Sequence, residues 1–327
     1  MTTKPSRRQF LRTLGSGILL AILGRRAANA SLLPAKDLEN SWSAGGSNFH
    51  AIYDDENLHN RFRAFLQNVF SIFPADRFHA MIADMTRAAV HDKAIYLASQ
   101  KRLPEIKPFA SEVRHALPAL FQQTRIVGQQ VQQLLGEGSE INGYMEIGSK
   151  GGYIAYARSK LKLRGDVVLL NTEAASYGLG DIFERRGLGK VGRFVGLNDY
   201  TPIREADVKT ASLDVVCNPI GFHHSPPEKR DAFVRSIRRC LRTGGKLIVR
   251  DHDVDSKAMN HMVALAHDVF NMGLEHAWDY NQREIRNFTS LQELTEYLSR
   301  FGFRSTGEVL YQKGDPTQNA FISYIAV

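Results

Sequence analysis

Apolar residues recur at helical spacing early in the chain, where five fall on one face of a predicted helix: Phe62, Phe65, Leu66, Val69 and Phe70. This helix is expected to end near residues 73–74, because a proline there stops it. Further amphipathic helices are predicted over residues 75–89, 93–100 and 107–135. The pattern predicts a helical N-terminal domain over residues 55–140, after a polar, aperiodic extended leader over residues 31–54.

From residue 141 onward short apolar runs alternate with amphipathic stretches, which is typical of a parallel α/β sheet. Strands are predicted over residues 143–147, 166–171, 193–197, 212–218 and 245–250, with helices over 228–241 and 256–270. The chain ends differently, with a helix over residues 291–301 and two strands, 305–312 and 320–327, joined by a turn at Gly314-Asp315-Pro316. This pair of strands predicts a closing antiparallel hairpin at one edge of the sheet.

The start of the chain carries the features of an export signal in order. Arg7-Arg8 precede an apolar run, residues 13–23, which is followed by Arg25-Arg26 and a small-x-small site, Ala28-Asn29-Ala30. Residues 1–30 resemble the bacterial Tat signal family, whose members are recognised by the Tat export machinery. The apolar run has about a dozen residues and a bilayer span needs about twenty, so no permanent membrane span is expected. We expect cleavage after Ala30 and a periplasmic protein, tethered to the membrane only if the signal stays uncleaved.

The signal segment accounts for most of the positive charge. The whole chain has 42 basic and 34 acidic residues, a net charge of +8. Residues 1–30 contain six basic residues and no acidic one, so the remainder has 36 basic against 34 acidic residues, a net charge of +2. This small charge does not indicate a nucleic-acid partner. The two cysteines, Cys217 and Cys240, are too few for a disulfide framework and lie in apolar contexts that predict burial.

The first predicted strand of the sheet ends in an acid and enters a glycine-rich turn, Glu146-Ile147-Gly148-Ser149-Lys150-Gly151-Gly152. Glycine has no Cβ, so a cofactor can approach the backbone closely at the start of the next helix. With the motifs that follow in order, residues 144–249 resemble the class I S-adenosylmethionine-dependent methyltransferases, the broad group that includes ubiquinone-biosynthesis and small-molecule enzymes. The resemblance implies a Rossmann-like seven-stranded sheet over residues 141–327, with Glu146 facing the amino end of the cofactor S-adenosylmethionine. The family has a glycine where this chain has Lys150.

Other positions implied to bind the cofactor follow the next strands. The family's ribose-binding acid corresponds to Asn171, with Glu173 as the alternative two residues later. Asp199 resembles the acid that holds the adenine; the alternative is a surface turn residue. The fourth strand ends at Asn218, and Asn218-Pro219 partly matches the signature of amide and base N-methyltransferases. The expected cofactor-binding residues are therefore Glu146, Gly148, Gly151, Gly152, Asn171, Glu173, Asp199 and Asn218.

Polar residues also gather where the fourth and fifth strands end, the edge at which open α/β sheets bind ligands. The predicted catalytic residues are His223, Asp251, His252 and Asp253. Either histidine is able to remove a proton from a methyl acceptor, with a neighbouring aspartate fixing its tautomer. Three alternatives stay open: a structural role for the adjacent His224, a helix-capping role for Asp253, and a metal held by His223, His252 and Asp253. Because the sequence lacks metal-ligand spacing, no metal is predicted.

Farther along the chain four residues are candidates to line an acceptor pocket with the helical segment, or to serve only in packing: His267, His276, Trp278 and Tyr280. The sequence thus predicts an exported enzyme that transfers a methyl group from S-adenosylmethionine to an unidentified small-molecule acceptor. The alternative is an exported, non-catalytic protein that binds S-adenosylmethionine or another ligand on a degenerate methyltransferase fold, which Lys150 and Asn171 favour. A dinucleotide-binding enzyme is less favoured, since the glycine turn lacks the second glycine of that fingerprint.

Overall fold

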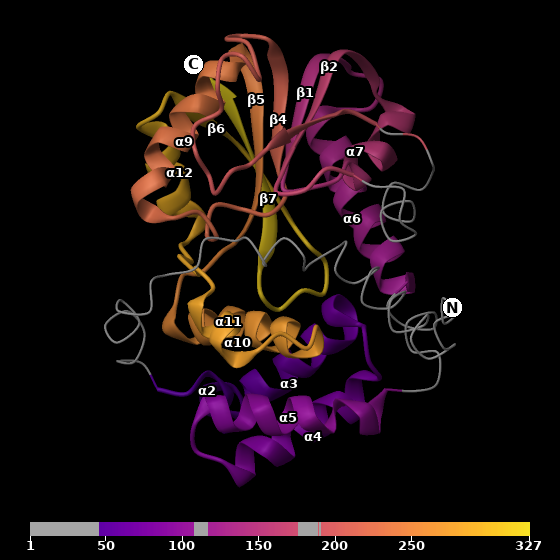
Figure 1. Cartoon of the computed structure of the whole chain (residues 1–327), viewed down its shortest axis with the longest axis vertical. Helices are drawn as coiled ribbons and strands as arrows, with labels where there is room; N and C mark the ends of the chain where they lie inside the picture. Colours follow the sequence, from indigo (N-terminus) through magenta and orange to yellow (C-terminus); the bar gives the residue numbers. More distant parts are fainter. Residues whose placement is uncertain (1–45, 108–116, 176–188, 190) are drawn as a thin grey trace, which may run out of the picture.

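The computed structural model describes residues 46–107, 117–175, 189 and 191–327. The predicted twin-arginine signal and most of the leader lie outside the described residues, as does part of the helix predicted over residues 107–135. Figure 1 shows a sheet flanked by helices, with a separate helical layer at one end of the sheet.

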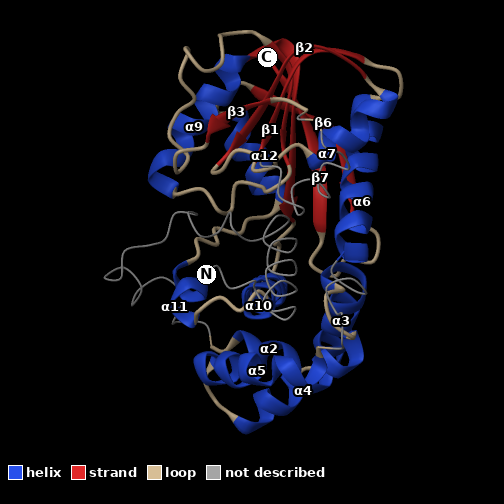
Figure 2. Ribbon diagram, turned by 45° about the vertical axis from the view of Figure 1, so that its right-hand side comes forward, coloured by secondary structure: helices blue, strands red, loops and turns tan. Residues whose placement is uncertain are grey.

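The sheet has seven strands in the order β3-β2-β1-β4-β5-β7-β6. Five are parallel: β1 (Glu140–Ile147), β2 (Lys162–Asn171), β3 (Arg193–Gly196), β4 (Leu213–Asn218) and β5 (Leu241–His252). The last two, β6 (Phe303–Tyr311) and β7 (Asn319–Ala326), pair antiparallel with each other, and β7 pairs antiparallel with β5. Figure 2 shows the strands side by side in one twisted sheet. The predicted strands and the closing antiparallel hairpin are confirmed.

Helices cover both faces of the sheet, which explains why its central strands are nearly continuous in apolar residues. Alternate residues of β1 enter different cores: Met145 and Ile147 pack with α9 (Pro227–Cys240) and α12 (Leu291–Ser299). Tyr144 packs on the opposite face with α6 (Leu117–Leu135) and α7 (Gly152–Ala157), which leads into the short η6 (Arg158–Lys160). Both cysteines are buried and free, as expected.

The helical layer at the end of the sheet contains five elements from the first part of the chain: α2 (Asn48–Tyr53), α3 (Glu56–Phe65), η4 (Leu66–Phe70), α4 (Ala75–Ala88) and α5 (Asp92–Ile106). The long helix α10 (Lys257–Gly273) shares their apolar core, and α11 (Trp278–Arg283) packs beside it. The apolar helix face predicted over residues 62–70 is largely buried. Four of its five residues are at most 1% exposed: Phe62, Phe65, Leu66 and Phe70. Packing therefore does not follow the sequence boundary at residue 140, because α6 joins the sheet and α10 joins the helical layer.

Two local predictions differ from the structure. Residues 48–53, assigned to the extended leader, form α2, whose first turn is capped by the Ser47 side chain. Asp92 also accepts hydrogen bonds from Ser47 Oγ and from the Asn48 backbone N–H, and such contacts from a distant helix are invisible in a local pattern. The helix predicted over residues 93–100 continues to Ile106 and includes Pro104. Among the helices of the described residues, none combines the length and apolarity needed to cross a membrane.

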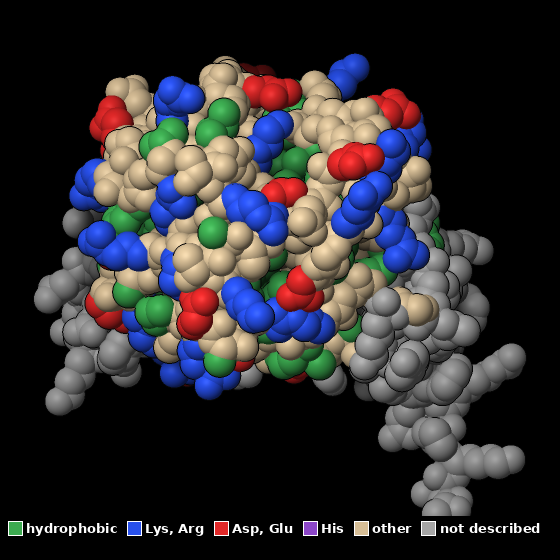
Figure 3. Space-filling view, turned by 90° about the horizontal axis from the view of Figure 1, so that it is seen from above, with side chains coloured by type: hydrophobic (Ala, Val, Ile, Leu, Met, Phe, Trp, Pro, Cys, Tyr) green, Lys and Arg blue, Asp and Glu red, His purple; other side chains and the backbone are tan. Residues whose placement is uncertain are grey.

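The sheet end of the molecule is a mixed charged surface. Figure 3 shows Lys and Arg side chains interspersed with Asp and Glu over this face. Exposed ion pairs on the described strands include Arg193 with Asp166, 2.6 Å apart. Such pairs contribute little to stability, because water screens both partners.

Candidate functional site

A cavity lies between the carboxyl ends of the parallel strands and the helical layer. Its sheet side is made by the turns that follow the strands: Gly148, Asn171, Thr172, Leu197, Asp199, Tyr200, Pro219 and Ile220. Its helical side is mainly apolar: Phe65, Val69, Phe70, Ile72, Leu120, Ala266, Phe270 and Leu274. Between them lie the basic and imidazole side chains His223, His224, Arg250, His252 and His267. The cavity thus joins the predicted cofactor turn to the predicted catalytic residues.

The glycine turn is built as the sequence indicates, with left-handed backbone at Gly148 (φ +71°) and Gly151 (φ +93°). Gly148 N–H donates to Leu170 O at 2.7 Å, which ties the turn to the end of β2. A Cβ at Gly148 would lie 2.4 Å from Cδ1 of Ile220, so the loop after β4 already occupies that space. A larger residue there would strain the protein itself as well as any ligand contact. Gly151 caps α7, and Gly152 is its first residue.

Glu146 is fully buried behind the glycine turn. Its Oε2 accepts hydrogen bonds from the Tyr144 hydroxyl and from the Ile154 backbone N–H, each at 3.0 Å. The carboxylate therefore stabilises the first turn of α7 and fixes the direction in which the glycine turn leaves β1.

Lys150, the departure from the family pattern, does not line the main cavity in the described residues. Its ammonium lies 3.7 Å from Glu173 Oε2, and both residues border a separate small pocket beside β3. Lys150 thus leaves the cavity open, and Glu173 is directed to the ammonium. Of the two residues considered for the ribose, Asn171 lines the cavity.

Asn171 is 1% exposed and ends β2 at the cavity. Its Oδ1 accepts from the Thr172 backbone N–H at 2.9 Å, whereas its Nδ2 has no hydrogen-bond partner among the described residues. A buried amide N–H without a partner is costly, so this group is suited to donate to a ligand.

Asp199 follows β3 in an uncommon backbone turn. Asn198, Asp199 and Tyr200 are three consecutive left-handed residues, with φ of 46°, 55° and 57°. Such conformations cost energy for residues other than glycine and concentrate at ligand sites. The Asp199 carboxylate pairs with Lys229 through Oδ2, while its buried Oδ1 has no hydrogen-bond partner in the described part of the chain. Asp199 is therefore a cavity residue with an available acceptor.

Asn218 is buried and donates from Nδ2 to Gly221 O at 3.0 Å. It does not line the cavity in the described residues but fixes the loop that carries His223. Asn218 was expected to contact the cofactor, but in the structure its side chain supports the loop behind the cavity.

His223 and Asp251 form the closest polar pair of the site. His223 Nδ1 lies 2.5 Å from Asp251 Oδ1, and Asp251 Oδ2 accepts from the Phe222 backbone N–H at 2.8 Å. Burial alone would raise the pKa of Asp251, but the charge and hydrogen bond of His223 lower it to about 2. The carboxylate is therefore ionised and holds the proton of His223 at Nδ1, which leaves Nε2 as the available nitrogen.

His252, the last residue of β5, points into the same cavity. Its Nδ1 lies 3.0 Å from Thr317 O, and Asn319 Nδ2 approaches Nε2 at 3.4 Å. Burial, aided by the neighbouring His223 and His267, lowers the pKa of His252 well below its ordinary value. A ring that resists protonation is a poor general base. The better candidate is His223, because Asp251 is bonded to its Nδ1 and can stabilise the imidazolium.

Asp253 was predicted to be catalytic, but the structure does not bring it to the cavity. Its Oδ1 accepts from the backbone N–H of Leu291, the first residue of α12, and its Oδ2 accepts from the Tyr311 hydroxyl at 2.6 Å. The chain turns away after His252, so this carboxylate ties α12 and β6 to β5. Asp253 therefore interacts with the first turn of α12, whereas the sequence suggested that it caps the next helix in the chain, α10.

Sequence reasoning missed the charges that surround the histidines. Glu284 Oε2 lies 3.5 Å from His267 Nδ1 and accepts from Arg286 at 2.9 Å. Arg286 also pairs with Asp268 of α10 at 2.7 Å. Glu284 and Arg286 lie in a segment without hydrophobic period, where charged side chains are normally expected at the surface.

Two other histidines differ in their relation to the cavity. His224 lines it and is held through Nδ1 by Ile285 O at 3.2 Å, and burial with the adjacent His223 lowers the pKa of His224 to about 3. His276 instead stacks on Tyr280, with ring centroids 4.5 Å apart. Of the four acceptor-pocket candidates, His267 alone lines this cavity among the described residues; Trp278 packs on Tyr96.

Known structures share the fold at low sequence identity. The pyocyanin biosynthetic protein PhzM matches 85% of this chain and 76% of its own, with 14% identity and a TM-score of 0.50. The 1,6-didemethyltoxoflavin-N1-methyltransferase of Burkholderia thailandensis, solved with 1,6-didemethyltoxoflavin and S-adenosylhomocysteine, matches 62% of this chain and 78% of its own, at 17% identity and a TM-score of 0.42. The mitomycin 7-O-methyltransferase MmcR matches 77% and 68%, at 14% identity and a TM-score of 0.44. No protein-family model matches the sequence, and no curated protein matches it.

At these identities the likeness concerns the fold alone. The Rossmann-like, seven-stranded class I methyltransferase fold with a helical N-terminal region, predicted from the sequence, is confirmed.

Proposed function

We propose that the protein transfers a methyl group from S-adenosylmethionine to a small-molecule acceptor. One observation carries the proposal: a single cavity joins the glycine turn, the unpartnered polar atoms of Asn171 and Asp199, and an apolar chamber that contains His223. The donor would lie over the sheet end, with its ribose near Asn171 and its adenine near Asp199. The acceptor would lie under the helical layer, beside the imidazoles.

Methyl transfer depends mainly on holding the acceptor in line with the sulfonium methyl group. An aromatic wall is formed by Phe270 with Phe65 and Phe70, whose ring centroids lie 5.7 and 5.1 Å from that of Phe270. This wall suits a flat apolar acceptor. If the acceptor is an alcohol, an acid or a protonated amine, His223 receives its proton at Nε2. Asp251 then stabilises the resulting imidazolium.

Asp199→Asn should weaken the binding of S-adenosylhomocysteine about tenfold, measured by calorimetry on the full chain. A hydrogen bond to a charged group contributes about 1.5–3 kcal/mol and a neutral one about 0.5–1.5, and a difference near 1.4 kcal/mol is tenfold. Asparagine tolerates the left-handed backbone, so the turn is preserved.

Asp166→Asn is the matched control, because it also neutralises an aspartate, but in an exposed ion pair. Its affinity should stay within about twofold of wild type. Failure of the wild-type chain to bind S-adenosylhomocysteine would rule out the proposed donor.

We also propose that the protein is exported by the Tat machinery to the periplasm, on the basis of Arg7-Arg8 and the apolar run after them. Replacing Arg7-Arg8 by Lys-Lys should retain the protein in the cytoplasm, because the receptor reads the arginine pair and not the charge. Cell fractionation measures the result. The same replacement at Arg25-Arg26 is the matched control and should leave export unchanged; retention by both or by neither would contradict the proposal.

A further inference from the structure

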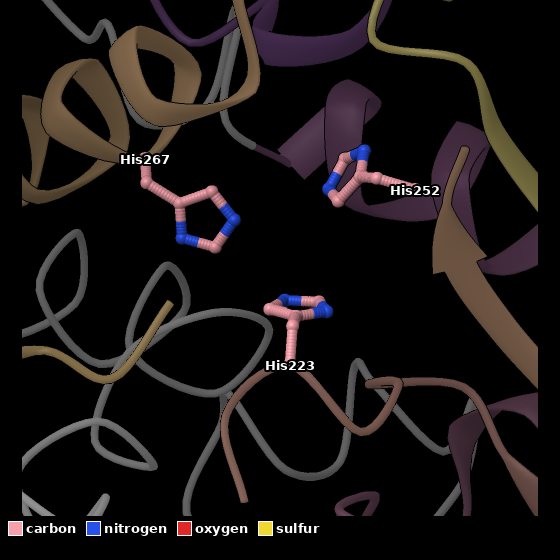
Figure 4. A group of neighbouring side chains, drawn as sticks. All are labelled: His223, His252 and His267. Atoms are coloured by element: carbon pink, nitrogen blue, oxygen red, sulfur yellow. The ribbon is translucent and has the colours of Figure 1, made fainter. Parts of the chain in front are cut away.

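Three imidazoles from separate elements meet in the cavity: His223 after β4, His252 at the end of β5 and His267 on α10. One ring nitrogen of each lies within 4.8 Å of those of the other two, and the ring centroids are 5.4 to 5.9 Å apart. Figure 4 shows the three rings around one shared space. We propose that this imidazole triad binds a divalent transition-metal ion such as Zn²⁺.

An oxygen atom holds each ring of the triad at Nδ1. The contacts are Asp251 Oδ1 to His223 at 2.5 Å, Thr317 O to His252 at 3.0 Å and Glu284 Oε2 to His267 at 3.5 Å. Ionised carboxylates and carbonyls only accept, so Nδ1 of His223 and of His252 carries a proton and Nε2 of each keeps its lone pair. Nε2 of His252 faces Asn319 Nδ2 at 3.4 Å, a contact that a metal ion would replace, and the longer contact to Glu284 favours the same tautomer in His267. Metal-binding histidines commonly donate their other ring nitrogen in this way, which fixes the tautomer and the ring orientation.

The surroundings also favour the neutral rings that a metal requires. His252 is 8% exposed and the His267 side chain 13%, so water has little access to either ring. Two carboxylates, Asp251 and Glu284, lie directly behind the triad, and Arg286 balances the second of them. A divalent cation between the three rings would therefore face their Nε2 lone pairs. The carboxylates on the other side of the rings would add net negative charge that stabilises the cation.

Ligand type and geometry indicate which ion. Imidazole nitrogens suit zinc, copper, iron or nickel, whereas magnesium and calcium prefer oxygen ligands. Tetrahedral zinc with bonds of about 2.0–2.1 Å places its ligand nitrogens about 3.4 Å apart, so the widest pair needs to close by about 1.4 Å at most. Three protein ligands leave a fourth position open to the cavity, as in catalytic zinc sites.

The open position faces the chamber assigned to the acceptor. A hydroxyl or thiol bound there would release its proton more readily, because the cation stabilises the anion. In the metal-loaded protein Nε2 of His223 would bind the ion and could not accept a proton. The ion, and not His223, would then promote deprotonation of the acceptor. Metal binding itself does not depend on methyl transfer.

A second cluster, His224 with His267 and Glu284, is also close enough to hold an ion. Glu284 Oε2, however, already accepts from Arg286 and from Asn271, each at 2.9 Å. Nδ1 of His224 is engaged by Ile285 O, 3.2 Å away. Glu284 therefore acts as the orienting partner of His267, and the imidazole triad is the better ligand set.

The test uses the full chain without a histidine tag, dialysed against Zn²⁺ and then against metal-free buffer, with metal content measured by mass spectrometry. About one ion per chain is expected. His252→Gln and His267→Gln should each lower Zn²⁺ affinity by more than the 10- to 100-fold that loss of an outer-shell partner costs. His261→Gln is the matched control, since His261 lies on the same helix but bonds to Asn48 Oδ1 outside the triad. Co²⁺ substitution should give the intense visible absorption of four-coordinate cobalt.

Wild-type protein that retains less than about a tenth of an ion per chain, or glutamine variants that bind Zn²⁺ as tightly as wild type, would overturn the proposal. Circular dichroism confirms that each variant is folded. Calorimetry with S-adenosylhomocysteine separates the two proposals: donor binding without metal binding leaves only the methyl-transfer proposal standing, and metal binding without donor binding leaves only the metal site.

Discussion

Replacing His223 by Ala is expected to lower turnover by about 10²- to 10⁴-fold, the usual contribution of a positioned proton acceptor. His223 is the cavity imidazole that is bonded to an ionised carboxylate, Asp251, at 2.5 Å. Donor affinity should change little, because the candidate donor contacts lie at Asn171 and Asp199. The measurement is S-adenosylhomocysteine formed per chain, with phenols, thiols and aromatic amines supplied as acceptors.

Asp251→Asn should reduce turnover as well, because an amide no longer fixes the tautomer of His223. This variant also separates the two roles of His223. If the ring is a base, zinc content stays unchanged; if it is a ligand, zinc affinity falls about 10- to 100-fold. His91→Ala, an exposed histidine at the start of α5, is the control and should retain full turnover. Full activity in His223→Ala would remove the residue from the reaction.

Much of the fold could be predicted because its information is local. Each central strand alternates between two apolar cores, and the glycines that end β1 need backbone conformations that other residues avoid. The packing of α10 could not be predicted in the same way. Its apolar face fits either a sheet or other helices, and only the assembled structure shows Met259, Met262 and Val263 in the helical layer.

The candidate site could also be predicted only in part. Asn171 and Asp199 reach the cavity because parallel strands end at one edge of the sheet. At the end of β5 that rule does not predict which of the adjacent side chains face the cavity. Asp251 bonds to His223, His252 lines the cavity and Asp253 turns toward α12, although the three are adjacent in sequence. The directions of side chains beyond a strand end depend on the path of the following loop.

His267 and its partners show a second limit. Helical periodicity marks His267 as one polar position on an apolar helix, which is commonly a packed histidine. Its place in the site depends on Glu284 and Arg286. These two residues follow α11 in the sequence and pack back against α10. Buried ion pairs of this kind follow from tertiary contacts, so a pattern of apolar residues does not reveal them.

Arg286→Leu is expected to lower the free energy of unfolding by about 3–5 kcal/mol, the usual cost of removing one partner from a buried ion pair. Arg286 is the cation between two buried carboxylates, bonded to Asp268 at 2.7 Å and to Glu284 at 2.9 Å. Leucine keeps much of the volume but leaves both acids without their counter-charge. Urea unfolding followed by circular dichroism measures the loss.

The dependence of this loss on pH tests its electrostatic origin. Burial would raise the pKa of Glu284, but Arg286 and then His267 hold it well below its ordinary value. In wild type this group therefore stabilises the fold above the unfolded pKa, and the stabilisation is lost as the pH falls through the folded value. Without Arg286 the largest lowering cause is gone and only the neighbouring imidazoles oppose the effect of burial, so we expect the folded pKa of Glu284 to rise and this group to stabilise the variant less at pH 7. The difference between wild type and variant should be smaller at low pH than at pH 7.

Arg283→Leu is the matched control, since Arg283 lies three residues earlier and makes an exposed contact with Asp279 O. A surface substitution of this kind changes stability by no more than about 0.5 kcal/mol. A loss in Arg286→Leu that is equal at both pH values would assign the effect to packing of the arginine stem. A loss confined to neutral pH would instead show that the arginine neutralises the carboxylate that orients His267.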